Sequence, residues 1–177
     1  MRTRFRTRLV VALLGLALAL PAQAEDRRDY PWVGFRLGGA WALSSAAGGT
    51  PSAGGGGAYA IFDAGDYLAD CSLDLFFGGG AHLADAGLGA YYPFSPGNVA
   101  PYLGGGIKVG WTKFGGEGTF GMVPFAALGV LFGRHAFPQL RLELAYFLAT
   151  SRERAGPTAA GDGTRASGPI LTIGLGF

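Results

Sequence analysis

The sequence predicts an all-β fold, an eight-stranded antiparallel up-and-down transmembrane β-barrel, from three observations. First, residues 169–177 alternate between two faces, which is the pattern of a strand whose faces meet different surroundings. Second, turn-forming residues divide residues 32–177 into eight segments, most of them long enough to cross a membrane as tilted strands. Third, no stretch beyond residue 24 is apolar for the 18 residues of a membrane-spanning helix, which excludes helical spans.

The N-terminal residues 1–24 predict a secretory signal peptide. Four arginines precede an apolar run at 9–20, and a proline and small residues then lead to Ala24. Because the apolar run is shorter than the roughly 20 residues that a spanning helix needs, we expect cleavage after Ala24 rather than an uncleaved anchor. Residues 25–31 are then a short periplasmic N-terminal segment, and residues 32–177 form the barrel domain.

Composition excludes several function classes. The formal net charge of +2 depends on the four arginines of the signal peptide, so it gives no support to nucleic-acid binding. Cys71 is the only cysteine, so no intrachain disulfide can form. The chain has 33 glycines, but its hydrophobic content of 49% is too high for a disordered segment. Glycines within apolar and aromatic stretches fit strands that bend around a small barrel.

The first half of the chain supplies four expected strands, at 32–43, 56–63, 67–77 and 81–93. In the first of these, Arg36 stands opposite an apolar face of Val33, Phe35, Leu37 and Trp41. The second lies between a glycine-rich loop at 44–55 and a short turn at 64–66. In the third, a polar face of Asp70, Ser72 and Asp74 opposes Tyr67, Ala69, Cys71, Leu73, Leu75 and Phe77. The fourth is bounded by the glycines at 78–80 and the turn at 94–98.

The second half supplies the other four, at 99–111, 120–132, 140–150 and 169–177. In the fifth, Tyr102 and Lys108 oppose Val99, Pro101, Leu103, Ile107, Val109 and Trp111. The sixth is delimited by the loops at 112–119 and 134–139. In the seventh, Leu140, Leu142, Leu144, Tyr146 and Leu148 oppose a face that carries Arg141 and Glu143. The eighth places Pro169, Leu171, Ile173, Leu175 and Phe177 on one face.

The connections give an independent check on this count. With both termini periplasmic, the even connections at 64–66, 94–98 and 134–139 are short, as periplasmic turns are. Three of the odd connections, at 44–55, 112–119 and 151–168, are longer and polar, as extracellular loops are. The short odd link at 78–80 does not fit this pattern.

Six charged residues share the minority faces of these strands, and they decide between two kinds of barrel. A soluble lipocalin-type barrel would be apolar inside, whereas a membrane barrel is apolar outside, and periodicity alone does not distinguish them. The apolar faces are too extensive for the interior of a small barrel, which favours the membrane form with the charges inside. Ionised groups inside must be paired. We therefore expect a lumen charge network of Arg36, Asp70, Asp74, Lys108, Arg141 and Glu143.

The chain resembles the small outer-membrane β-barrel superfamily, which includes OmpA-like and OmpX-like eight-stranded barrels. The stretch Ala90-Tyr91-Tyr92-Pro93-Phe94 to Pro101-Tyr102-Leu103-Gly104-Gly105-Gly106 looks like the hairpins of that superfamily. Ile173, Leu175 and Phe177 are similar to the C-terminal signal that the barrel-assembly machinery recognises. The resemblance implies an exported protein of the cell outer membrane, with outer-membrane lipids, lipopolysaccharide and that machinery as partners. It leaves the oligomeric state open.

The resemblance favours a structural or surface-interaction role, with the lumen plugged by the charged network. A narrow pore for ions or small solutes is the first alternative. A lipid A-modifying enzyme is the second, and we expect no enzyme activity, because the available histidines, His82 and His135, form no recognisable catalytic motif with a serine. The sequence contains no phosphate-binding loop and no histidine, cysteine and carboxylate cluster with metal-ligand spacing, so no cofactor is expected.

Overall fold

A computed structural model describes residues 31–46, 49–154 and 163–177, and the predicted signal peptide and its cleavage site lie outside them. These residues form eight strands: β1 (Trp32–Trp41), β2 (Ser52–Asp63), β3 (Leu68–Gly78), β4 (Ala81–Pro93), β5 (Val99–Phe114), β6 (Thr119–Phe132), β7 (Gln139–Glu153) and β8 (Thr164–Gly176). The described part of the chain contains no helix with the length and apolarity to cross a membrane.

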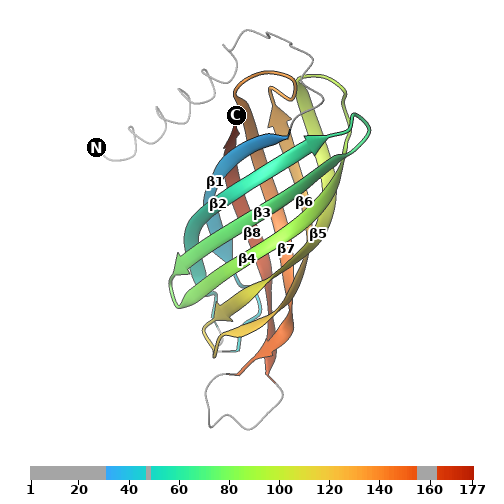
Figure 1. Ribbon diagram of the computed structural model, residues 1–177. Helices are drawn as coiled ribbons and strands as arrows, with labels where there is room; N and C mark the ends of the chain where they lie inside the picture. The colour runs from blue at the N-terminus through green and yellow to red at the C-terminus, as the bar shows by residue number, and fades with distance from the viewer. Residues whose placement is uncertain (1–30, 47–48, 155–162) are drawn as a thin grey trace, which may run out of the picture.

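The strands form one closed barrel in sequence order, and every neighbouring pair is antiparallel. Closure is made by β8 against β1, from Gly34↔Gly176 to Ala40↔Ile170. Figure 1 shows that β1 begins and β8 ends at the same end of the barrel, together with the turns after β2, β4 and β6. The connections after β3 and β5, the end of β7 and the start of β8 lie at the opposite end, which we call the loop end. The predicted fold class is confirmed.

Strand boundaries differ from prediction mainly at the loop end. β2 begins at Ser52, inside the expected loop at 44–55, because Ala53 and the four following glycines pair with β1. β7 continues to Glu153 and β8 begins at Thr164, inside the expected loop at 151–168. Glycine and serine mark loops by their weak strand preference, but hydrogen bonding to a neighbouring strand overrides it. The barrel therefore extends further at the loop end than propensity predicts.

The short link at 78–80 is a genuine turn between β3 and β4. All three glycines have positive φ values, of 123°, 52° and 78°. A Cβ on Gly79 would lie only 2.4 Å from the Ser52 carbonyl oxygen, so this glycine also allows the turn to approach β2. The exception to the pattern of long odd loops therefore has a steric reason.

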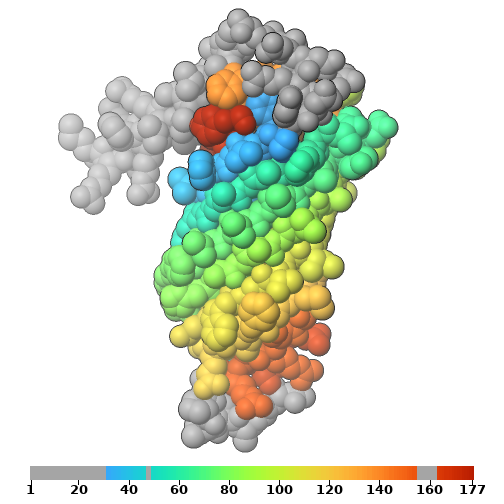
Figure 2. Space-filling view, in the orientation of Figure 1, coloured from blue at the N-terminus to red at the C-terminus, as the bar shows by residue number. Residues whose placement is uncertain are grey.

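The two faces of the barrel wall are chemically opposite. Large apolar side chains on its outer face remain exposed, as Phe35 at 66% and Leu88 at 69% illustrate. Figure 2 shows this outer surface over β1 to β5 on the near side of the barrel. The inner face carries most of the buried residues, including most of the charged ones. Charged residues inside and exposed apolar side chains outside are the reverse of a soluble barrel.

Candidate functional site in the lumen

The structure places all six residues of the expected lumen charge network on the inner face. Each is at most 6% exposed, and they come from β1, β3, β5 and β7. They occur at alternate positions because a strand directs successive side chains to opposite faces. Asp85 of β4 and three buried tyrosines, Tyr59, Tyr91 and Tyr102, join them. The site is therefore a continuous polar section of the lumen.

The first part of this section is the Lys108 cluster, formed by Arg36, Asp74, Asp85 and Lys108. The Arg36 guanidinium binds both oxygens of Asp74, with Nε 2.7 Å from Oδ1. Lys108 Nζ lies 2.5 Å from Asp74 Oδ2 and 3.2 Å from Asp85 Oδ1. Asp74 and Asp85 are directly opposite on β3 and β4, an arrangement that repels like charges, and Lys108 separates them.

Asp85 is the residue of this cluster that sequence reasoning missed. Its contact with Lys108 lies within ion-pair distance, yet neither carboxylate oxygen has a partner in hydrogen-bond geometry. The polar section thus holds four carboxylates and three cations rather than three of each. Asp85 could have been found from its spacing, because it lies two residues after Leu83 and two before Gly87, on the inner face of β4.

The second part is the Arg141 cluster, which lies nearer the chain termini. Arg141 pairs with Asp70, at 2.7 Å from Nη1 to Oδ2, and with Glu143. Its Nε donates to the Tyr102 hydroxyl at 2.8 Å, and that hydroxyl donates to Glu143 at 2.9 Å. The guanidinium also lies 5.0–5.4 Å from the ring centres of Tyr59, Tyr91 and Tyr102. A buried arginine is stabilised by both kinds of contact.

The two clusters meet through Arg36, whose Nη1 lies 3.6 Å from Glu143 Oε1. Glycines on the inner face provide the space for these long side chains. A Cβ on Gly129 would lie 2.4 Å from the Tyr102 hydroxyl, and one on Gly87 would lie 2.3 Å from Lys108 Cγ. The sequence predicts that glycines let the strands bend, and in the structure they also leave the space into which the polar side chains fit.

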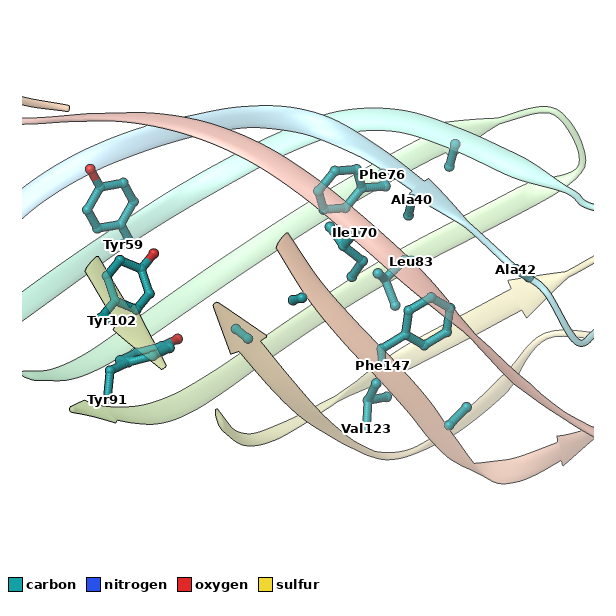
Figure 3. Close-up of a cluster of buried hydrophobic side chains, with 14 of the residues drawn as sticks. Ala40, Ala42, Tyr59, Phe76, Leu83, Tyr91, Tyr102, Val123, Phe147 and Ile170 are labelled. Atoms are coloured by element: carbon teal, nitrogen blue, oxygen red, sulfur yellow. The ribbon is translucent and has the colours of Figure 1, made fainter. Parts of the chain in front are cut away.

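An apolar layer lies inside the barrel on the loop side of the polar section. Phe76, Leu83, Val123 and Phe147 are each at most 1% exposed. Figure 3 shows these side chains converging on the barrel axis, beside the group formed by the three tyrosines. Phe114 stacks on Phe147 with ring centres 5.1 Å apart. In the described part of the barrel, ionic and apolar contacts thus occupy successive levels of the lumen.

A further ion pair, also missed from the sequence, lies at the terminus end. Arg134, in the turn after β6, binds both oxygens of Asp63 at 2.6 Å and the backbone oxygens of Ser95 and Gly65. Partial burial raises the pKa of Asp63, but hydrogen bonds from Arg134 and the Gly65 amide outweigh it and lower the pKa below the ordinary value. This pair joins three turns that are separate in sequence.

Within residues 31–46, 49–154 and 163–177, the structure brings no serine and carboxylate together with either histidine. His82 points outward, in an edge contact with Phe77 at 5.7 Å between ring centres, whereas Ser72 and Asp74 of the neighbouring strand are buried on the inner face. His135 lies in the turn after β6, where its Nε2 is 2.9 Å from the Pro96 oxygen. Among the described residues, no group of three or more histidine, cysteine or carboxylate side chains could hold a metal ion.

Comparison with solved structures shows the same fold in other proteins. The crystal structure of Neisserial surface protein A (NspA) matches with a TM-score of 0.57 and 16% identity, over 82% of this chain and 97% of that one. The N-terminal β-barrel domain of Pseudomonas aeruginosa OprF matches with a TM-score of 0.50 and 14% identity, over 84% and 98%. No family model and no curated protein matches the sequence. At these identities the likeness establishes the fold, that of the small eight-stranded outer-membrane barrels.

Proposed function

We propose that this protein is an integral barrel of a bacterial outer membrane with a structural or surface-interaction role. The observation that carries the proposal is the inverted wall, with leucines, isoleucines and aromatic side chains exposed outside and salt bridges inside. In water, such an exterior would expose far more contiguous apolar surface than a soluble monomer does. In a bilayer it is the expected lipid contact, and barrel closure leaves no unpaired edge.

Three lines support the outer membrane as its location. The expected signal peptide and cleavage after Ala24 would direct the chain out of the cytoplasm. The fold is shared with Neisserial surface protein A and with the OprF barrel domain. The outward alternation of Ile173, Leu175 and Phe177 in the closing strand suits recognition by a barrel-assembly machinery. Outer-membrane lipids and lipopolysaccharide would then surround the wall.

The lumen contents favour a closed barrel over a pore. Arg36, Lys108 and Arg141 lie within ion-pair distance of carboxylates, and the apolar layer lies beyond them. Small barrels have interiors just wide enough for side chains to fill. If the lumen is plugged, and since the described residues form no catalytic constellation, the connections at the loop end would make the contacts with other molecules.

The experiment is fractionation of cells that express the full chain, followed by electrophoresis with and without heating. We expect the mature protein, beginning at Glu25, in the outer-membrane fraction with a heat-modifiable mobility. Recovery as a soluble periplasmic protein without detergent would overturn the location. Mass spectrometry of lipid A with and without the gene tests the enzyme alternative, which predicts a changed acyl pattern.

A further inference from the structure

The outer wall of the barrel is uneven, and the uneven part is a groove. The outward positions of β6, β7 and β8 carry mostly large side chains, among them Met122, Leu128, Leu144 and Leu171. The corresponding positions of β2 to β5 instead include many small residues: Ala58, Ala60, Ala69, Cys71, Ala84, Ala86, Ala90 and Gly105. This side of the barrel faces the viewer in Figure 2.

The small residues adjoin one another because the strand register aligns them. Ala60, Cys71, Leu88 and Ile107 form one cross-strand row, and Ala58, Leu73, Ala86 and Val109 form the next. Together these rows line a groove of about 1010 Å³ in the outer wall. The residues that line it are mainly alanine, glycine, leucine, isoleucine and valine, together with Cys71, Tyr59 and Ser72. A shallow, open apolar groove of this kind offers a flexible hydrocarbon chain more contact than a flat wall does.

A basic pair stands at the loop end of the same wall. His82 and Lys113 are directly opposite on β4 and β5. The next row toward the groove pairs Ala84 with Trp111, and Trp111 is exposed. Lys113 lies four residues beyond Val109 on the same face of β5, which is about 13 Å along the strand. The Glu153 carboxylate interacts with Lys113, but both its oxygens also accept the Phe114 backbone N–H.

We propose that this wall binds one phosphorylated lipid of the surrounding leaflet. An acyl chain occupies the groove, and the headgroup phosphate contacts Lys113, with His82 as a second donor. The charge complementarity of a phosphate and a lysine at the membrane surface identifies the occupant, because an apolar partner would gain nothing from this pair. The inference rests on the proposed membrane location.

The test uses full-length mature protein inserted in nanodiscs and the fluorescence of Trp111. A Trp41→Phe background removes the tryptophan exposed on β1, and Trp32 is buried at 6% exposure. Phosphatidylglycerol or phosphatidylcholine with brominated chains is mixed in small amounts with unbrominated phosphatidylcholine. Quenching of Trp111 then reports which lipid occupies the wall beside it. Free inorganic phosphate is added in a parallel arm as a competitor.

We expect brominated phosphatidylglycerol to quench Trp111 at a several-fold lower mole fraction than brominated phosphatidylcholine. Lys113→Gln should reduce this preference about fivefold, the equivalent of roughly 1 kcal/mol per basic residue near a membrane surface. Ala86→Leu, which fills the groove, should weaken quenching by both lipids. The matched controls are Arg165→Gln, an exposed arginine on β8, and Ala126→Leu, an exposed alanine on β6.

Equal quenching by the two lipids, or equal effects of the test and control variants, would overturn the lipid site. So would complete competition by inorganic phosphate, because that outcome assigns the binding to a free anion. Heat-modifiable mobility of each nanodisc sample separates these outcomes from failure of the membrane proposal. A barrel that inserts without lipid preference refutes the lipid site alone, whereas one that does not insert refutes the membrane location.

Discussion

Arg141 shows at the level of a residue how a charge is accommodated inside this barrel. Its guanidinium is 2% exposed and is contacted by Asp70, Glu143 and the Tyr102 hydroxyl. Burying an ion is costly unless both charge and hydrogen bonds are compensated, and here several strands contribute the compensation. The loss of unfolding free energy when one partner is removed therefore measures how dry the lumen is.

Replacing Glu143 with alanine should destabilise the barrel by about 3–5 kcal/mol if the lumen is dry, because Arg141 loses a buried partner. In a hydrated lumen the loss should be nearer 0–1 kcal/mol, because water screens the remaining charges. Urea unfolding in detergent micelles measures the difference. Glu117→Ala, at an exposed loop position, is the control and should be nearly neutral. A loss no greater than that of the control would refute the dry plug.

Asp63 should make stability depend on acidity at the terminus end. Its pKa is lower in the folded barrel than its usual 3.8, so its contribution is fully present above that value. The contribution is lost as pH falls through the lowered, folded-state pKa. We therefore expect Asp63→Asn to flatten the decline of unfolding free energy below about pH 4. Unfolding series for both proteins from pH 7 to pH 3 provide the measurement, and parallel curves would contradict the role of the Arg134 pair.

At the scale of elements, β8 carries the closure of the barrel. The Phe177 backbone N–H donates to the Val33 oxygen at 2.8 Å, and its ring lies 5.9 Å from that of Phe137. The closing strand thus anchors both to β1 and to the turn after β6. A strand in this position completes the hydrogen bonding of β1, whose edge would otherwise be exposed to lipid.

Deleting Phe177 should therefore reduce the amount of assembled barrel in the outer membrane. The variant loses the terminal backbone pair with Val33 and the aromatic residue of the expected assembly signal. Pulse labelling followed by unheated electrophoresis measures the assembled fraction over time. Phe94→Ala is a suitable control, because it removes an exposed aromatic side chain from a turn between β4 and β5 at the same end. Normal assembly of the deletion variant would argue against a role of the terminus.

Considered as a whole molecule, the barrel has a lumen that holds buried side chains at more than one level. The ionic clusters occupy its middle, and the apolar layer with Phe114 and Phe147 lies toward the loop end. Since the two levels are built from different side chains, each can be changed separately. Conductance is a property of the complete barrel, because an ion must pass both.

In planar bilayers we expect the refolded wild-type barrel to show no stable conductance. Phe114→Ala combined with Phe147→Ala should produce small conductance steps, because it removes the stacked rings from the apolar layer. The control, Leu128→Ala with Leu144→Ala on the outer wall, should show no conductance. Core truncations of this size cost about 3–5 kcal/mol each, so heat-modifiable mobility must first show that the variant is folded. Steady wild-type conductance would favour the narrow pore.

Particular residues show how far the sequence alone could be interpreted. The alternation in residues 140–150 and 169–177 predicted strands whose inner and outer faces the structure reproduces. Asp85 was missed because β4 has small residues on both faces, which weakens its periodicity. Arg134 was missed because its partner Asp63 lies 71 positions away, and only barrel closure brings their turns together. The extra strand length at the loop end was missed because glycine has a low strand propensity, which does not show that these residues pair with a neighbouring strand.

By itself, the sequence determined the architecture, because a period of two along strands of membrane-crossing length is a local property that a single segment displays. It also determined which residues share a face. Only the tertiary structure decided which charges meet, since Lys108 reaches Asp74 and Asp85 through the register of three strands. The outer groove likewise exists only because strand register aligns small residues from neighbouring strands. Contacts between strands depend on register and curvature, which no single segment encodes.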